Sequence, residues 1–186
     1  KSETYVASIG SEPNLGYNKF YRAFLVSIRS SQKEISITTP YFLPDTMVIE
    51  EIKRALHRGV QVSLMLPDPK FISEFPVTYA SQRHYPELVR LGMKLYHYKV
   101  RMLHSKYAVF DRKFVILGSS NLDFRSLFIN EEADVMIYDS LVAKSVLDIF
   151  QNDIKKSQNI TWEQTTNRNI LHKTLEGFWI LWEFLL

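Results

Sequence analysis

Apolar residues recur every three or four positions in several segments of the chain, and these segments alternate with short stretches rich in β-branched residues. The first spacing is typical of helices with one buried face, and the second composition is typical of strands. Helices are predicted at residues 17–30, 45–59, 78–92 and 140–157, and the tail from about 162 to 186 is also predicted to be helical. Strands are predicted at residues 34–42, 60–67, 93–99, 106–111, 113–118 and 132–139. This alternation predicts a single α/β domain over residues 1–186.

The ends of several predicted elements carry recognisable signals. Asp45 is predicted to cap the helix at 45–59, and Gly59 is predicted to end it. Pro86 interrupts the helical pattern at 78–92, so we expect a break or kink there. The stretches with neither pattern are expected to be loops, at residues 1–16, 67–76 and 157–161.

Composition excludes several classes of protein. A formal net charge of +3 gives no sign of the strongly basic surface of a nucleic-acid binder. The absence of cysteine excludes disulfides and thiolate zinc sites. No run of eighteen apolar residues exists that would span a bilayer as a helix. Because the chain begins at Lys1 without the pattern of a signal peptide, we expect it to be a piece of a longer protein.

Polar side chains gather in the stretch HSKYAVFDRKFVILGSSN, residues 104–121, which otherwise predicts two buried strands joined by a tight turn. Because alternate residues of a strand share a face, His104 and Lys106 are expected to point to one side and Asp111 to the other. An imidazole beside an ammonium group suits an anionic substrate, since the first can attack and the second can hold the charge. Asp111, which points away, is expected to be structural, as a turn cap or a partner of backbone amides.

The end of the second predicted strand adds neutral polar groups. Gly118 permits a sharp turn and a close approach to a ligand. Ser119 and Asn121 offer hydrogen-bond donors at the same strand end. Together with the histidine and the lysine, these residues predict a binding site for a phosphate ester.

The complete spacing, His-x-Lys-x4-Asp-x6-Gly-Ser-x-Asn, resembles the HKD signature of the phospholipase D superfamily. Flanking segments extend the likeness over nearly the whole chain and are similar to the C-terminal catalytic half of bacterial-type cardiolipin synthases. These segments are TTPYFLPD, ALHRGVQVSLMLP, LHSK, NLDFRS and NEEADVMIYD. The resemblance implies an α/β fold with a mixed central sheet flanked by helices on both faces.

The resemblance also implies roles for individual residues. His104 either attacks phosphorus to form a phosphohistidine or protonates the leaving alcohol, while Lys106 and Asn121 bind phosphate oxygens. An acidic residue after the signature accepts a hydrogen bond from the histidine ring. By position this residue is Glu132, with Glu131 as the alternative. Neither a metal nor another cofactor is expected, because lysines supply the positive charge.

Five positions are expected to contact the substrate, three of them with an alternative interpretation. Gly118 and Ser119 are assigned to the substrate by their place in the signature. The resemblance places Tyr41 and Phe42 at the entrance of the site, against an acyl chain or glycerol, although PYFLP could also simply end a strand. Arg125 either binds a second phosphate or caps a helix.

The full signature occurs once, whereas the family mechanism needs two motifs. The chain is therefore expected to be half of an active site, completed by a second half of a longer chain or by a homodimer. The implied function is phosphatidyl transfer from phosphatidylglycerol to form cardiolipin at the bacterial cell membrane, with membrane phospholipids and no nucleic acid as partners. The amphipathic tail at 162–186 lies either in the membrane interface or against protein.

Two other classes of function remain open at this stage. The first is a homodimeric phosphodiesterase or endonuclease, or a phospholipase D hydrolase, of the same superfamily. The second is a non-catalytic lobe that binds phospholipid or a protein partner.

Overall fold

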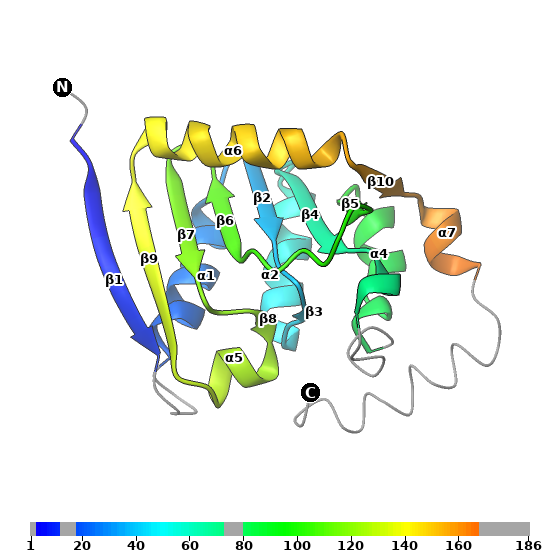
Figure 1. Ribbon diagram of the computed structural model, residues 1–186, viewed down its shortest axis with the longest axis horizontal. Coiled ribbons are helices and arrows are strands. Elements are labelled where there is room, and N and C mark those ends of the chain that lie inside the picture. Colours follow the sequence, from blue (N-terminus) through cyan, green and yellow to red (C-terminus); the bar gives the residue numbers. More distant parts are fainter. Residues whose placement is uncertain (1–2, 12–17, 73–79, 168–186) are drawn as a thin grey trace.

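The computed structural model describes residues 3–11, 18–72 and 80–167. A mixed sheet of eight strands runs through the centre of this part, in the order β1-β9-β7-β6-β2-β4-β5-β10 (Figure 1). Its strands are β1 (Tyr5–Ser11), β2 (Glu34–Thr38), β4 (Gln61–Pro67), β5 (Lys94–Tyr98), β6 (Tyr107–Phe110), β7 (Phe114–Gly118), β9 (Glu132–Tyr138) and β10 (Ser157–Ile160). A separate small sheet pairs β3 (Phe42–Leu43) with β8 (Leu122–Asp123).

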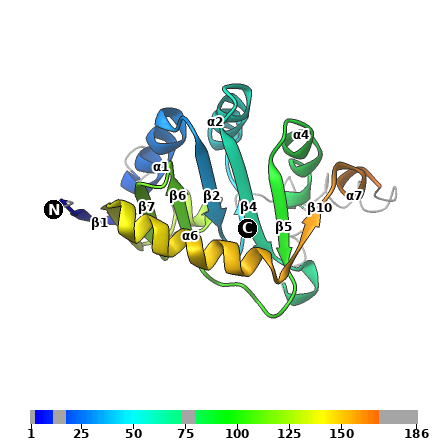
Figure 2. The same ribbon diagram turned by 90° about the horizontal axis from the view of Figure 1, so that it is seen from above.

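Helices cover both faces of the central sheet. They are α1 (Lys19–Ser30), α2 (Thr46–His57), α4 (Tyr85–Arg90), α5 (Phe124–Phe128), α6 (Ser140–Ile154) and α7 (Trp162–Thr166), and a short 3-10 helix covers Pro69–Phe71. Viewed from above, α1, α2 and α4 lie on one face, and α6 crosses the strands on the other (Figure 2). The expected mixed sheet with helices on both faces is therefore confirmed.

The directions of the strands decide where the polar stretch lies. Strands β2, β4 and β5 are parallel, whereas β6, β7, β9 and β1 are each antiparallel to their neighbours. The segment before β6, the end of β7 and the start of β9 therefore meet at one edge of the sheet. The C-terminal end of β2 lies at the same edge, because Thr38 pairs with Tyr107.

Two hydrophobic layers hold the helices to the sheet. The larger layer joins α1, α2 and α4 to the strands and includes Phe24, Ile28 and Ile52, each at most 2% exposed. The smaller layer lies under α6, where Ala143 and Phe150 are buried against the other face. Each fully buried isoleucine or phenylalanine side chain in these layers contributes about 1.5–3 kcal/mol to stability relative to its exposure to water. Together the layers fix the strands that carry the polar stretch.

The helix signals read from the sequence are confirmed. The carboxylate of Asp45 accepts a hydrogen bond from the Val48 backbone N–H at 3.0 Å and caps α2. Gly59, just past the end of α2, has φ of +84°, a value that L side chains rarely adopt. The helix predicted at 78–92 is interrupted, because residues 83–84 form a turn and α4 begins at Tyr85. Pro86 lies in the first turn of α4, where its missing N–H has no helical partner to lose.

The loops predicted at residues 1–16 and 157–161 are wrong in part. Strand β1 lies within the first segment and pairs with β9, and β10 fills most of the second and pairs with β5. Both are edge strands with largely exposed side chains, so no alternation of apolar and polar residues marks them. In the third predicted loop, 67–76, β4 continues to Pro67 and a 3-10 helix covers Pro69–Phe71.

The C-terminal tail is described only at its start. Helix α7 ends at Thr166, and the remainder of the helix predicted at 162–186 lies outside the described residues. Within the residues that the structure describes, no helix combines the length and the apolar character needed to cross a membrane.

Candidate active site

His104 and Lys106 lie side by side just before β6. The Lys106 Nζ atom is 3.1 Å from Nδ1 and 3.3 Å from Nε2 of the His104 ring. It also donates a hydrogen bond to the His104 carbonyl oxygen at 3.0 Å. Residues 102–106 are not part of a strand, so this local bond, rather than strand alternation, brings the two side chains together. His104 is exposed and Lys106 is half-buried, which leaves the imidazole accessible to a substrate.

The residues after β7 form a turn in which three consecutive side chains each lie against a different carboxylate. Residues 119–121 are named here the polar turn. The Ser119 hydroxyl donates to Glu132 and the Ser120 hydroxyl donates to Asp134, while the Asn121 side chain lies close enough to Asp123 to favour a lower pKa of that carboxyl. The Ser119 backbone N–H also donates to the Ala133 carbonyl at 3.0 Å, and the Ala133 N–H returns a bond to Ser119 Oγ at 2.9 Å.

Gly118 is needed here for a reason different from the one expected. It does not have the positive φ of Gly59 and Gly92. Instead, a Cβ atom at Gly118 would lie 2.2 Å from Oδ1 of Asp134 and 2.4 Å from the Ala133 carbonyl oxygen. The glycine therefore permits the close approach of β7 to β9, and its expected contact with a ligand stays a prediction.

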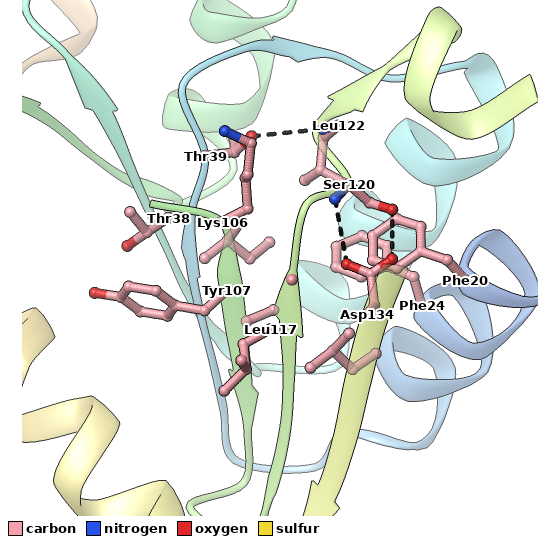
Figure 3. A pocket seen from close by; sticks show the side chains of 14 residues that line it. Phe20, Phe24, Thr38, Thr39, Lys106, Tyr107, Leu117, Ser120, Leu122 and Asp134 are labelled. Carbon is pink, nitrogen blue, oxygen red and sulfur yellow. Dashed lines mark hydrogen bonds between the residues drawn. The ribbon is translucent and has the colours of Figure 1, made fainter. Parts of the chain in front are cut away.

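Burial dominates the electrostatics of the site. It lowers the pKa of Lys106 below its ordinary value, although the carboxylates of Glu132 and Asp123 act in the opposite direction. Burial also raises the pKa values of Asp123 and Asp134, against the hydrogen bonds that each accepts. Figure 3 shows Asp134 bonded to Ser120 next to the aromatic rings of α1, with Lys106 extending toward Thr39 on the other side of the pocket.

Glu132 lies at the site but is engaged by other side chains. Its carboxylate accepts hydrogen bonds from Ser119, from the Ser126 hydroxyl at 2.9 Å and from the Asn130 amide at 3.4 Å. Among the described residues, no hydrogen bond joins Glu132 to His104. The predicted bond from the histidine ring to Glu132 therefore stays a prediction. The alternative, Glu131, is exposed.

Asp111 has the structural role predicted for it. It occupies the turn between β6 and β7 at φ of +50°. Its carboxylate accepts from the backbone N–H groups of Gln32, Lys33 and Glu34, at 2.9, 2.8 and 3.0 Å. Burial tends to raise the pKa of Asp111, but these bonds outweigh it and hold the pKa below its ordinary value. The residue thus ties the β6–β7 turn to the segment that enters β2.

The three outer positions of the predicted site, Tyr41, Phe42 and Arg125, differ in how far their side chains are exposed. Tyr41 is half-buried and lines a pocket with His97. Phe42 is 1% exposed and packs against Tyr85, so the expected contact of Phe42 with an acyl chain is wrong. Arg125 is exposed on α5, and neither its phosphate-binding role nor its capping role is tested.

A second histidine–lysine spacing occurs at His97 and Lys99, without the rest of the signature. Burial lowers the pKa of His97 to about 4, and Lys99 forms a salt bridge with Asp68 at 2.6 Å. This pair therefore does not supply a second motif. Among the described residues, no group of three histidine or acidic side chains is arranged to hold a metal ion.

Several residues of the site were not found by sequence reasoning. Asp123, Ser126 and Asp134 are each at most 4% exposed. Asp134 bonds to the polar turn, Ser126 bonds to Glu132, and Asp123 lies against Asn121. Two signals were available in the sequence. Asp123 stands where a helix cap would precede FRSLF, and Asp134 interrupts the apolar pattern of β9.

Solved structures with the same architecture define the fold. Nuc from Salmonella typhimurium, a phospholipase D family member, matches with a TM-score of 0.71 and 20% identity over 86% of this chain and 99% of that chain. Phosphatidylserine synthase from Haemophilus influenzae matches with a TM-score of 0.79 and 16% identity over 98% of this chain and 48% of that chain. The fold is therefore that of the phospholipase D family.

Sequence comparison defines the family more narrowly. Residues 24–154 match the family described as cardiolipin synthase, phospholipase D-like domain, and the chain belongs to that family. Cardiolipin synthase 2 of Staphylococcus epidermidis is 36% identical over 173 residues, which make up 92% of this chain and 34% of the relative. Cardiolipin synthase of Halalkalibacterium halodurans is 31% identical over 95% of this chain and 35% of the relative. The chain thus spans about a third of the length of these curated relatives.

Proposed function

We propose that this chain forms one catalytic half of a phospholipase D-type phosphatidyltransferase that makes cardiolipin from phosphatidylglycerol. Relatives that bear the name cardiolipin synthase support this proposal. The observation that carries it is the pairing of His104 with Lys106 beside the polar turn. A nucleophile, a cation and neutral hydrogen-bond donors, which are the groups that a phosphodiester substrate requires, occur at one edge of the sheet.

The proposed reaction has two displacements at phosphorus. A ring nitrogen of His104 attacks one phosphatidylglycerol, and the N–P bond forms as the P–O bond to the terminal glycerol breaks. A second histidine, from another copy of the motif, protonates the departing glycerol. A hydroxyl group of a second phosphatidylglycerol then attacks phosphorus, its proton passes to the second histidine, and the N–P bond breaks. The products are cardiolipin and glycerol, and both histidines return to their starting states.

The remaining residues support this chemistry by binding and orientation. Lys106 stabilises the negative charge on the phosphate, and an N–H of the Asn121 amide donates to a phosphate oxygen. Glu132 accepts from the other ring nitrogen of His104 and so selects its tautomer. Tyr41 and Arg125 are proposed to contact the lipid outside the reacting centre.

The substrates place the enzyme at a membrane, and the second histidine requires a partner. We propose that the protein acts on phospholipids at the bacterial cell membrane. The second motif belongs either to another half of a longer chain or to a second copy of this chain in a homodimer.

The test is a product assay on vesicles of phosphatidylglycerol labelled in the terminal glycerol. The protein is added at concentrations that span its self-association. Transfer releases labelled glycerol together with cardiolipin, and His104→Ala is expected to give neither product. Mass spectrometry of the acid-sensitive intermediate should locate a phosphatidyl group on a histidine. Cardiolipin formation that persists with His104→Ala would contradict the proposal.

A phosphodiesterase of the same superfamily, acting as a homodimer, is the second candidate. The chain aligns with 99% of Nuc, a phospholipase D family member that is itself no longer than one such domain. In the same assay, this activity would yield phosphatidic acid and labelled glycerol without cardiolipin, because water replaces the lipid alcohol in the second displacement.

A further inference from the structure

The polar turn is held from behind by two buried carboxylates that the proposed mechanism does not use. Asp123 and Asp134 are 4% and 3% exposed. Asp134 bonds to Ser120, and Asp123 lies against the Asn121 side chain. Burying a carboxylate is costly unless hydrogen bonds compensate it, so two such groups behind one three-residue turn need a reason.

We infer that Asp123 and Asp134 are positioning residues, which fix Asn121 and Ser120 so that the polar turn presents its donors to a phosphodiester in a single geometry. The inference rests on the proposed function, because it assigns these residues to the binding of the same substrate.

The orientation of the Asn121 amide depends on Asp123. A carboxylate can only accept, so it must face the amide nitrogen. The amide oxygen of Asn121 is buried and has no hydrogen-bond partner among the described residues. The proximity of the Asp123 carboxylate therefore selects one of the two amide orientations, with the amide nitrogen toward Asp123, and leaves an N–H of the amide for a phosphate oxygen. Asp123 is itself fixed, because it caps α5 by accepting from the Ser126 backbone N–H at 2.8 Å.

Asp134 fixes the middle of the turn through both its oxygens. Oδ1 accepts from the Ser120 backbone N–H at 3.2 Å, and Oδ2 accepts from the Ser120 hydroxyl. On the other side, the Asp134 carboxylate meets Gly118, where a Cβ atom would lie 2.2 Å from Oδ1. The backbone of Gly118 in turn donates to the Lys106 carbonyl at 3.2 Å. A shift of Asp134 would therefore move the polar turn relative to Lys106.

Charge gives Asp123 a second effect on the site. The carboxylate of Asp123 acts together with that of Glu132 to raise the pKa of Lys106, against the larger effect of burial. Neutralising Asp123 should therefore lower the pKa of Lys106 further. A residue that only capped α5 would not change this pKa when replaced by an equally good cap.

The Asp123 experiment separates positioning from capping. Asp123→Asn retains an oxygen that can cap α5 but removes the charge, while Asp123→Ala removes both. Asp139→Ala is the matched control, because Asp139 also caps a helix, by accepting from the Leu141 N–H at 2.7 Å, away from the site. Thermal unfolding of each variant reports the loss of the cap, and turnover of phosphatidylglycerol is measured per folded molecule.

Positioning predicts that both Asp123 variants lower kcat about 10- to 100-fold with a smaller change in KM. Asp123→Asn should do so at nearly unchanged thermal stability. NMR should also show a lower Lys106 pKa in Asp123→Asn and a changed shift of the Asn121 side-chain amide. Asp139→Ala should lower stability only. If Asp123→Asn matches wild type in turnover, in the Lys106 pKa and in the amide shift, Asp123 is a helix cap and the inference is overturned.

The Asp134 experiment uses the rescue of function by a conservative change. Asp134→Asn can still accept from the Ser120 N–H, whereas Asp134→Leu has a similar shape and no acceptor. We expect Asp134→Asn to retain most of the turnover and Asp134→Leu to lose about 10- to 100-fold. Amide hydrogen exchange at Ser120 should quicken in Asp134→Leu alone. Equal turnover and equal exchange in the two variants would overturn the assignment of Asp134.

The proposed function and the positioning role of the two carboxylates are overturned by different results. If neither the dimer of this chain nor an assembly in which another half supplies the second motif produces cardiolipin or phosphatidic acid, the proposed function fails. The Asn121 amide shift, the Lys106 pKa and the Ser120 exchange rate still decide whether the carboxylates hold the turn, because none of these measurements requires turnover.

Discussion

Individual side chains at the site divide into an accessible histidine, the proposed nucleophile or acid, and a set of buried side chains around it. His104 is exposed, so its ring makes little contribution to packing and is free to meet phosphorus. Lys106 is half-buried, and Asp123 and Asp134 are almost fully buried behind it. Changes to the first kind of residue should affect chemistry alone, whereas changes to the second kind should combine effects on chemistry and on stability.

Replacement of His104 by alanine should abolish turnover while the fold survives. A nucleophile or general acid that is lost without a substitute typically costs at least about 100- to 10,000-fold in rate. His57→Ala is the control, because His57 is also exposed but lies on α2, away from the polar turn. Circular dichroism should be the same for both variants, and only His104→Ala should be inactive. Turnover by folded His104→Ala at the wild-type rate would refute the role of His104.

Glu132→Gln should fold but turn over slowly, because an amide orients the imidazole and stabilises its positive charge less well than a carboxylate does. Glu131→Gln is the matched control one residue away. Glu132 is the first residue of β9 and is half-buried, whereas Glu131 precedes the strand and is exposed, so the two variants should differ clearly. The comparison is made by steady-state kinetics over a range of pH. A damaging Glu131→Gln with a silent Glu132→Gln would transfer the proposed role to Glu131.

Gly118→Ala should destabilise the protein by about 1–3 kcal/mol through overpacking. The Asp134 carboxylate is only part of the obstacle, because the Ala133 carbonyl oxygen would lie 2.4 Å from the new Cβ atom. Combining Gly118→Ala with Asp134→Ala should therefore not restore stability, as measured by urea unfolding. Full restoration would mean that the carboxylate alone excludes a side chain at this position.

The site illustrates which contacts can be predicted from sequence. His104 and Lys106 are two residues apart in the sequence, so the contact between their side chains can be predicted from local spacing. The Ser120–Asp134 pair is separated by 14 residues, and its contact depends on the register of β7 against β9. That register is set by packing of the whole sheet, so the sequence could mark Asp134 as a break in an apolar pattern but could not predict its bond to Ser120 or the reason for Gly118.

At the scale of elements, the predictable parts are those with an internal pattern. Helix α2 has a cap, an apolar stripe and a terminal glycine, and all three were found in the sequence. Strands β1 and β10 have none of these signals, because four of the first five β1 side chains and half of those in β10 face solvent. Such edge strands exist through hydrogen bonds to a neighbour, and the sequence of the strand alone does not reveal that neighbour.

Asp111 links two elements, and its contribution should depend on pH. Its folded-state pKa lies below the ordinary value, so the ionised carboxylate stabilises the fold above the unfolded pKa of about 3.9. That stability is lost as the pH falls through the lower folded-state pKa. Asp111→Asn keeps a residue type that tolerates positive φ but removes the charge. The difference in melting temperature between wild type and Asp111→Asn should be constant near pH 7 and should shrink below about pH 4. A difference that is unchanged down to pH 2 would contradict this role.

At the scale of the whole molecule, the site contains more negative than positive groups. Three carboxylates, Asp123, Glu132 and Asp134, support the polar turn, and Lys106 is the cation next to it. An anionic phosphodiester should therefore bind weakly to this half alone. A second motif would add another lysine and another histidine, which is consistent with the small share of the relatives' length that this chain spans.

The protein should accordingly be inactive as a monomer. One chain carries the full signature once, while the proposed mechanism needs a nucleophile and an acid on opposite sides of phosphorus. If two copies associate with their His104 rings facing each other, hydrolysis of a small phosphodiester should appear as the dimer forms. The measurement is specific activity against protein concentration, with sedimentation velocity on the same samples.

Specific activity should follow the fraction of dimer. Mixing with an excess of the His104→Ala variant should suppress it, because a mixed dimer has a histidine at position 104 in only one of its two chains. Constant specific activity in a range shown to be monomeric would exclude a shared site. It would also require this single chain to supply both the nucleophile and the acid.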